Sequence, residues 1–160
     1  EARKETTMDL ILWRHAEAED ELELGGDLAR RLTPKGEKQA SRMAAWLDRQ
    51  LPDGARIYAS PAVRTEQTVV ALGRKYRLRD ELAPDGTPEQ LLQLVQWPEA
   101  KGATLVVGHQ PALGRVIAQL LGLQAPECAV RKGAVWWLRQ REREGVKQTV
   151  VVTVQTPELQ

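Results

Sequence analysis

The sequence predicts an α/β domain: a three-layer α/β/α sandwich with a mostly parallel central sheet and a C-terminal antiparallel hairpin. Three observations support this prediction. Short, unbroken apolar runs at 10–13 and 104–107 are typical of strands covered on both faces of a parallel sheet. Segments with helical periodicity separate the runs. Near the C-terminus, 134–138 and 147–154 resemble two strands joined by a polar turn.

Each predicted strand of the parallel part ends abruptly at polar residues. The run 10–13 stops at Arg14 and His15, and 104–107 stops at Gly108 and His109. A shorter strand, 56–59, ends at Ser60. We expect residues 8–160 to form one domain, which suits a chain of 160 residues. The polar residues 1–7 are expected to be an N-terminal extension or a cloning remnant.

Helix starts are marked by a capping hydroxyl followed by proline, which suits the first helical position. This pattern occurs at 33–34, 60–61 and 87–88, and Thr87 with Gln90 also forms a capping box. A further helix is expected after Pro111, with Gly122 as its stop.

Composition excludes several classes of protein. The 23 basic and 22 acidic residues leave a formal net charge of +1, which does not suggest a nucleic-acid binder or a polybasic membrane anchor. No apolar run approaches the roughly 20 residues that span a bilayer. The single Cys128 cannot form an internal disulfide, so we expect a cytoplasmic location.

The residues that carry chemistry follow the predicted strands. Arg14, His15, Arg64 and His109 all lie at or soon after a strand end. In open parallel sheets, ligands bind beyond the carboxyl ends of the strands, so these four side chains are expected on one side of the sheet. Two of the segments lead into predicted helix N-termini, whose free N–H groups and dipoles favour an anion. The combination predicts a phosphate site.

Four segments resemble the motifs of the histidine phosphatase superfamily: 14–16, 32–40, 60–68 and 107–111. They run in the family's order, and the short chain points to the small SixA-like branch of phosphohistidine phosphatases. One departure is Ala16, where many members carry glycine. The resemblance implies a phosphoglycerate mutase-like fold and a phosphatase. Each motif alone is weakly specific, whereas four in order are strongly so.

The resemblance also implies a two-step mechanism. Neutral His15 attacks phosphorus and becomes a covalent phosphohistidine, which water then hydrolyses. Arg14 and Arg64 bind the non-bridging oxygens with forked N–H groups, and His109 adds a donor as charge builds up. Neither a metal nor another cofactor is expected. Many relatives place a carboxylate acid after the third strand, which makes Glu81 the candidate; a solvated or helix-capping acid is the equal alternative.

The chain is too short to supply a large lid, so the site is expected to be open. An open site suits a phosphohistidine on a partner protein, because small metabolites usually need enclosure. The alternatives are a small-molecule phosphomonoesterase or, from another class, a non-catalytic phospho-ligand binding module. A monomer or weak homodimer is expected. The acidic residues in 16–30 are interpreted either as a solvated loop or as a rim that repels polyanions; they are Glu17, Glu19, Asp20, Glu21, Glu23 and Asp27.

Overall fold

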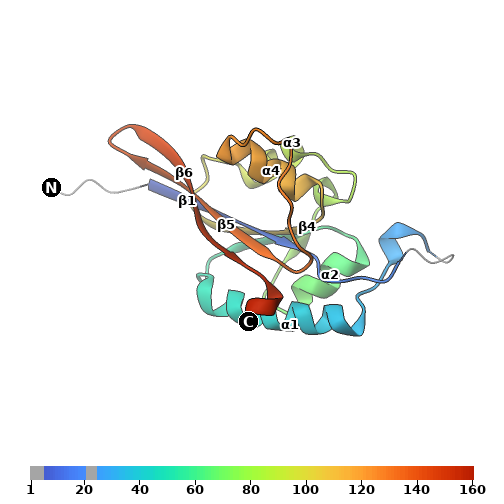
Figure 1. Cartoon of the computed structure of the whole chain (residues 1–160). Coiled ribbons are helices and arrows are strands. Elements are labelled where there is room, and N and C mark those ends of the chain that lie inside the picture. Colours follow the sequence, from blue (N-terminus) through green and yellow to red (C-terminus); the bar gives the residue numbers. More distant parts are fainter. Residues whose placement is uncertain (1–5, 21–24) are drawn as a thin grey trace.

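A six-stranded sheet runs through the centre of the structure, a computed structural model that describes residues 6–20 and 25–160 (Figure 1). The strand order is β3-β2-β4-β1-β5-β6. The strands are β1 (Thr6–Arg14), β2 (Arg56–Ala59), β3 (Arg77–Leu78), β4 (Gly102–Gly108), β5 (Val135–Arg143) and β6 (Val146–Gln155). The first four strands in this order are parallel to one another. Strand β5 pairs antiparallel with β1, and β6 pairs antiparallel with β5. The predicted fold class and the C-terminal hairpin are therefore confirmed.

Helices cover both faces of the sheet. In Figure 1, α1 (Pro34–Gln50) and α2 (Val63–Val70) lie on one face, and α3 (Pro88–Val95) and α4 (Ala112–Leu121) lie on the other. Short 3-10 turns, η1 (Asp27–Ala29), η2 (Asp80–Leu82) and η3 (Pro157–Leu159), occupy connections and the C-terminus. None of the helices in the described part of the chain is both long and apolar enough to cross a membrane.

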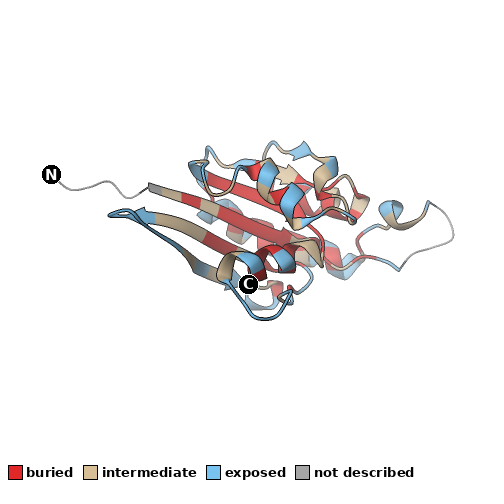
Figure 2. Ribbon diagram, turned by 90° about the horizontal axis from the view of Figure 1, so that it is seen from above, coloured by how far each residue is buried: buried red, intermediate tan, exposed pale blue. Residues whose placement is uncertain are grey.

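Two apolar cores lie on opposite faces of β1, because successive strand residues point to opposite sides. Ile11 and Trp13 pack in the core beneath α1 and α2, whereas Leu10 and Leu12 pack in the core beneath α3 and α4. Figure 2 shows that burial is concentrated in the central strands and falls off toward the tip of the β5–β6 hairpin. The unbroken apolar run 10–13 thus reflects a strand covered on both sides.

The hydroxyl caps explain two of the three predicted helix starts. Thr33 accepts the N–H of Gly36, and Thr87 and Gln90 form the full capping box. Gly122 ends α4 in the left-handed region, as expected. The start predicted at 60–61 is wrong by two residues, because α2 is capped by Ala62 and begins at Val63.

Strand β1 begins at Thr6, so it includes two residues from the segment 1–7 that was expected to be an extension. Thr6 and Thr7 pair with Glu142 and Arg141 of β5. The other five residues of that segment lie outside the described part of the chain.

Candidate active site

Strand register brings the three polar strand ends together. Arg14 at the end of β1 is paired with Gly108 at the end of β4, and Ala59 at the end of β2 is paired with Val107. The backbone N–H of His15 then donates to Gly108 at 3.1 Å, and that of Ser60 donates to Val107 at 3.1 Å. The three segments therefore leave the sheet side by side, as predicted.

The two histidines of the chain meet at this edge. The rings of His15 and His109 are 5.2 Å apart between centroids and tilted by 56°. Both side chains are almost fully buried, with 5% and 4% of their surface exposed. They are close enough for one phosphoryl group to contact both rings.

His15 is held in one tautomer. Its Nδ1 lies 2.7 Å from the carbonyl oxygen of Ala16, which can only accept, so Nδ1 carries the proton and Nε2 keeps a free lone pair. Burial lowers the pKa of His15 to about 3. The hydrogen bond to Ala16 opposes this shift, while the charges of Arg64, Arg14 and Arg30 add to it. The imidazole is therefore neutral near pH 7.

His109 is bonded to a serine that the prediction treated as a helix cap. Its Nε2 lies 2.7 Å from Ser60 Oγ, which also accepts the N–H of Ala62 at 3.2 Å. Burial lowers the pKa of His109 to about 3, and the nearby His15 and Arg64 contribute to this shift. Both histidines are thus neutral at physiological pH.

Arg64 projects from the first turn of α2 and is held by Asp27, which the sequence analysis named only as one acid of the 16–30 loop. Its two terminal nitrogens donate to Asp27, one to the carbonyl oxygen at 2.8 Å and one to Oδ2 at 3.1 Å. Arg30 donates to Asp27 Oδ1 at 2.9 Å. Partial burial opposes ionisation of Asp27, but the hydrogen bonds from Arg30 and Arg64 outweigh it and lower the pKa of the carboxyl.

Arg14 completes the cationic side of the site. One terminal nitrogen donates to the carbonyl oxygen of Val130 at 2.7 Å. Burial, together with the charge of Arg64, lowers the pKa of the Arg14 guanidinium. In the described part of the chain, Arg14 Nε, Arg64 Nε and His109 Nδ1 are buried without a hydrogen-bond partner. Buried polar atoms are nearly always paired, and exceptions are concentrated at functional sites.

Glu81 lies on η2, at the edge of this cluster. It lines a narrow cavity together with His109 and Leu113. Its carboxylate is paired with Arg79, with the closest oxygen 2.7 Å from a guanidinium nitrogen. Its own backbone N–H and then Arg79 lower the pKa of Glu81, which favours the ionised form. A proton donor would need the opposite shift.

Thr68 is a further contributor that sequence reasoning did not single out. Its hydroxyl accepts the backbone N–H of Ala16 at 3.1 Å and donates to the carbonyl oxygen of Arg64 at 2.7 Å. It thereby ties the segment after His15 to α2. A signal was present, because Thr65 and Thr68 are polar residues on the buried face of a helix.

No group of three or more metal-ligating side chains is assembled anywhere in residues 6–20 and 25–160. The side chains gathered at the strand ends are instead two arginines and two neutral histidines. This donor set suits a tetrahedral oxyanion, to which arginine can offer two parallel N–H groups.

Comparisons with known proteins agree with this geometry. Residues 10–85 match the model of the histidine phosphatase superfamily (branch 1). The chain is 31% identical to the phosphohistidine phosphatase SixA of Escherichia coli, over 74% of this chain and 78% of the relative. It is 29% identical to the SixA homolog of Haemophilus influenzae, over 74% of this chain and 80% of the relative. A solved structure of protein histidine phosphatase SixA with tungstate has a TM-score of 0.78 and 24% identity, covering 96% of this chain and all of that one.

Proposed function

Since the chain belongs to the histidine phosphatase superfamily and is a phosphatase, we propose that it hydrolyses phosphohistidine in a partner protein through a covalent phosphohistidine on its own His15. The observation that carries the proposal is the state of His15. Its imidazole is neutral, its tautomer is set by Ala16, the charges of Arg64 and Arg14 act on it, and its ring lies 5.2 Å from that of His109 between centroids.

In the first step, His15 Nε2 attacks phosphorus and the bond from phosphorus to the substrate's leaving nitrogen breaks. Arg14 and Arg64 hold the non-bridging oxygens, and their charges offset the charge that builds up on the transferring group. His109 lies close enough to contact the same group. The ring nitrogen of the substrate that does not carry phosphorus already holds a proton from solvent, so cleavage of the P–N bond releases a neutral imidazole rather than an anion.

In the second step, water attacks the phosphorus of phospho-His15. The P–N bond breaks, orthophosphate is released, and His15 returns to its neutral form. Burial favours this cycle, because the neutral ring is both the attacking group and the leaving group. A low pKa on His15 thus supports both halves of the reaction.

The leaving group distinguishes phosphohistidine from a phosphate ester. An ester releases an alkoxide, which needs a strong proton donor, whereas an imidazole can leave already protonated. Its own backbone N–H and then Arg79 lower the pKa of Glu81, so the carboxyl in this position is a poor proton donor at neutral pH. The names of the relatives point to the same substrate, since two are phosphohistidine phosphatases of the SixA type.

The decisive experiment is to trap the phosphoenzyme. A brief reaction with a 32P-labelled phosphohistidine protein should label the chain with a phosphate that is stable to base and labile to acid. His15→Ala should abolish the label, whereas Arg115→Ala, at an exposed position of α4, should retain it. Full labelling of His15→Ala would disprove the role of His15. Faster turnover of sugar or nucleotide phosphates than of the phosphohistidine protein would instead favour the small-molecule phosphomonoesterase.

A further inference from the structure

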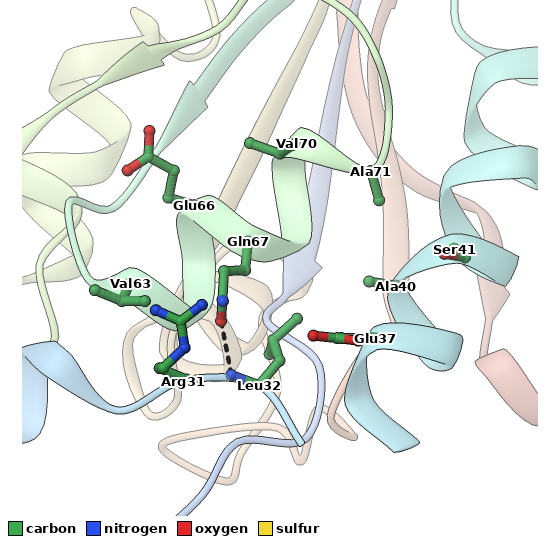
Figure 3. A pocket seen from close by; sticks show the side chains of 10 residues that line it. All are labelled: Arg31, Leu32, Glu37, Ala40, Ser41, Val63, Glu66, Gln67, Val70 and Ala71. Atoms are coloured by element: carbon green, nitrogen blue, oxygen red, sulfur yellow. Dashed lines mark hydrogen bonds between the residues drawn. The ribbon is translucent and has the colours of Figure 1, made fainter. Parts of the chain in front are cut away.

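A groove of about 470 Å³ runs over α2 toward α1 (Figure 3). We call it the α1–α2 groove, and it is lined by Arg31, Leu32, Glu37, Ala40, Ser41, Val63, Glu66, Gln67, Val70 and Ala71. None of these side chains belongs to the set that surrounds His15. The groove is therefore a separate feature of the surface.

The lining residues on each helix are three or four positions apart, which places them on one face of that helix. On α2 they fall at 63, 66, 67 and 70, and on α1 at 37, 40 and 41. Residues three and four apart share one face of a helix, so each helix contributes a continuous stripe. Two such stripes form the trough that an amphipathic helix occupies in helix-in-groove recognition.

The groove has an apolar floor and a charged rim. Leu32 and Ala40 are buried, and Gln67 accepts the N–H of Leu32 at 2.7 Å, which closes the floor (Figure 3). Val70 is 54% exposed at the far end of α2. An apolar centre with a polar margin is the usual composition of a protein interface.

Two residues that line the groove are next in the chain to residues of the candidate active site. Val63 precedes Arg64, and Arg31 follows Arg30, which pairs with Asp27. Because the histidines and Arg64 are 4–5% exposed, a phosphorylated side chain must insert to reach them. The protein that carries this side chain must then lie against the surrounding surface, which includes the groove residues Arg31 and Val63.

The charges on the rim specify the occupant further. Glu37 and Glu66 are acidic members of the lining, and Arg31 is the lining residue next to the site. One oxygen of Glu66 accepts the hydroxyl of Tyr76 at 2.6 Å, which fixes the position of this carboxylate. Carboxylates on the rim favour basic side chains on the helix that docks.

We propose that the α1–α2 groove binds an amphipathic helix of the phosphorylated partner protein, with its apolar face on Val63, Val70 and Ala71 and basic side chains toward Glu37 and Glu66. This inference rests on the proposed function. On this proposal the enzyme recognises the helical conformation of the segment beside the phosphohistidine as well as the phosphoryl group itself.

Two matched probes test the proposal. One is an amphipathic, lysine-flanked peptide of about 15 residues, long enough for a marginal helix, with a single histidine phosphorylated by phosphoramidate. The other is the same peptide locked into a helix by lactam bridges. The wild-type enzyme should show a KM about tenfold lower for the bridged peptide, because this peptide is already helical and loses less conformational entropy on binding. Equal KM values for the two peptides would overturn the proposal.

Val70→Glu should raise the KM for the bridged peptide about tenfold, since it places a charge against the apolar face. Turnover of free phosphoramidate should not change. Val146→Glu is the matched control, because Val146 is 67% exposed on β6. An unchanged KM in Val70→Glu would contradict helix docking.

Glu37→Lys gives a second, independent readout. It should reverse the preference of the enzyme from bridged peptides flanked by lysine to those flanked by glutamate, and an unchanged preference would refute the assigned occupant. If sedimentation showed that Val70→Glu converts a wild-type dimer into monomers, the groove would bind a second copy of the chain and the proposal would fail. Wild-type enzyme that hydrolyses neither peptide nor phosphoramidate would instead disprove the proposed function.

Discussion

Lowering the pH from 8 to 5 is expected to leave both imidazoles of the candidate site uncharged. An ordinary histidine has a pKa of about 6.5, so about 97% of its rings are protonated at pH 5. Burial lowers the pKa of both His15 and His109 to about 3, which leaves about 1% protonated at the same pH. The neutral fraction that can attack phosphorus therefore differs about thirtyfold between the two cases.

Nuclear magnetic resonance can follow this directly, because the chain contains only two histidines. In protein labelled with 15N-histidine, the chemical shifts of the ring nitrogens of both histidines should stay constant from pH 8 to 5. The His15 spectrum should show the tautomer protonated at Nδ1, as its bond to Ala16 requires. His109→Gln assigns the two sets of signals. A titration midpoint near pH 6.5, or a His15 ring protonated at Nε2, would refute the reasoning.

Three further predictions concern charge, packing and acid stability. Asp27→Asn should tighten vanadate binding, measured by calorimetry, on the order of fivefold, because it removes a negative charge beside Arg64. Asp20→Asn, at an exposed position of the same loop, should leave vanadate binding unchanged. Gly36→Ala should lower the free energy of unfolding in urea by about 2–3 kcal/mol, because its Cβ would meet the Glu17 carbonyl oxygen; Gly54→Ala, with open space around it, should not. His109→Gln should make the loss of stability from pH 6.5 to 4 shallower by about 1.4 kcal/mol per pH unit. The sign follows because the folded pKa of His109 is depressed, so the unfolded chain binds the extra proton as the pH falls through 6.5.

Most of the fold could be predicted because its signals are local. The buried runs that became β1 and β4 are apolar throughout, and the caps at Thr33 and Thr87 have unambiguous side-chain chemistry. Strand β3 carries no such signal, since Arg77 and Leu78 are both exposed and form a two-residue strand. The start of α2 was misplaced because Ser60 has the chemistry of a cap but bonds His109.

The site was predictable where it depends on strand ends and was missed where it depends on long-range contacts. Parallel topology places Arg14 and His109 at one edge whatever the details of the loops. The partner of Arg14 is the backbone carbonyl of Val130, 116 residues away, and a carbonyl group is common to every residue type. The contact between Asp27 and Arg64 was also unpredictable, because nothing in the sequence indicates which of the six acids in the 16–30 loop will reach Arg64.

The pairing of Asp27 with Arg64 bears on the two interpretations of the acidic loop 16–30, as a solvated loop or as a rim that repels polyanions. Asp27 is a counter-ion of Arg64, and Glu17 accepts the hydroxyl of Thr33 at 2.7 Å, so these two acids have specific structural partners. Glu21 and Glu23 lie outside the described residues. The candidate site brings Arg14 and Arg64 together, and the carboxylate of Asp27, whose side chain is 42% exposed, pairs with Arg64. We expect a phosphoryl dianion to supply the negative charge that this arrangement lacks, while Asp27 offsets part of the positive charge of Arg64.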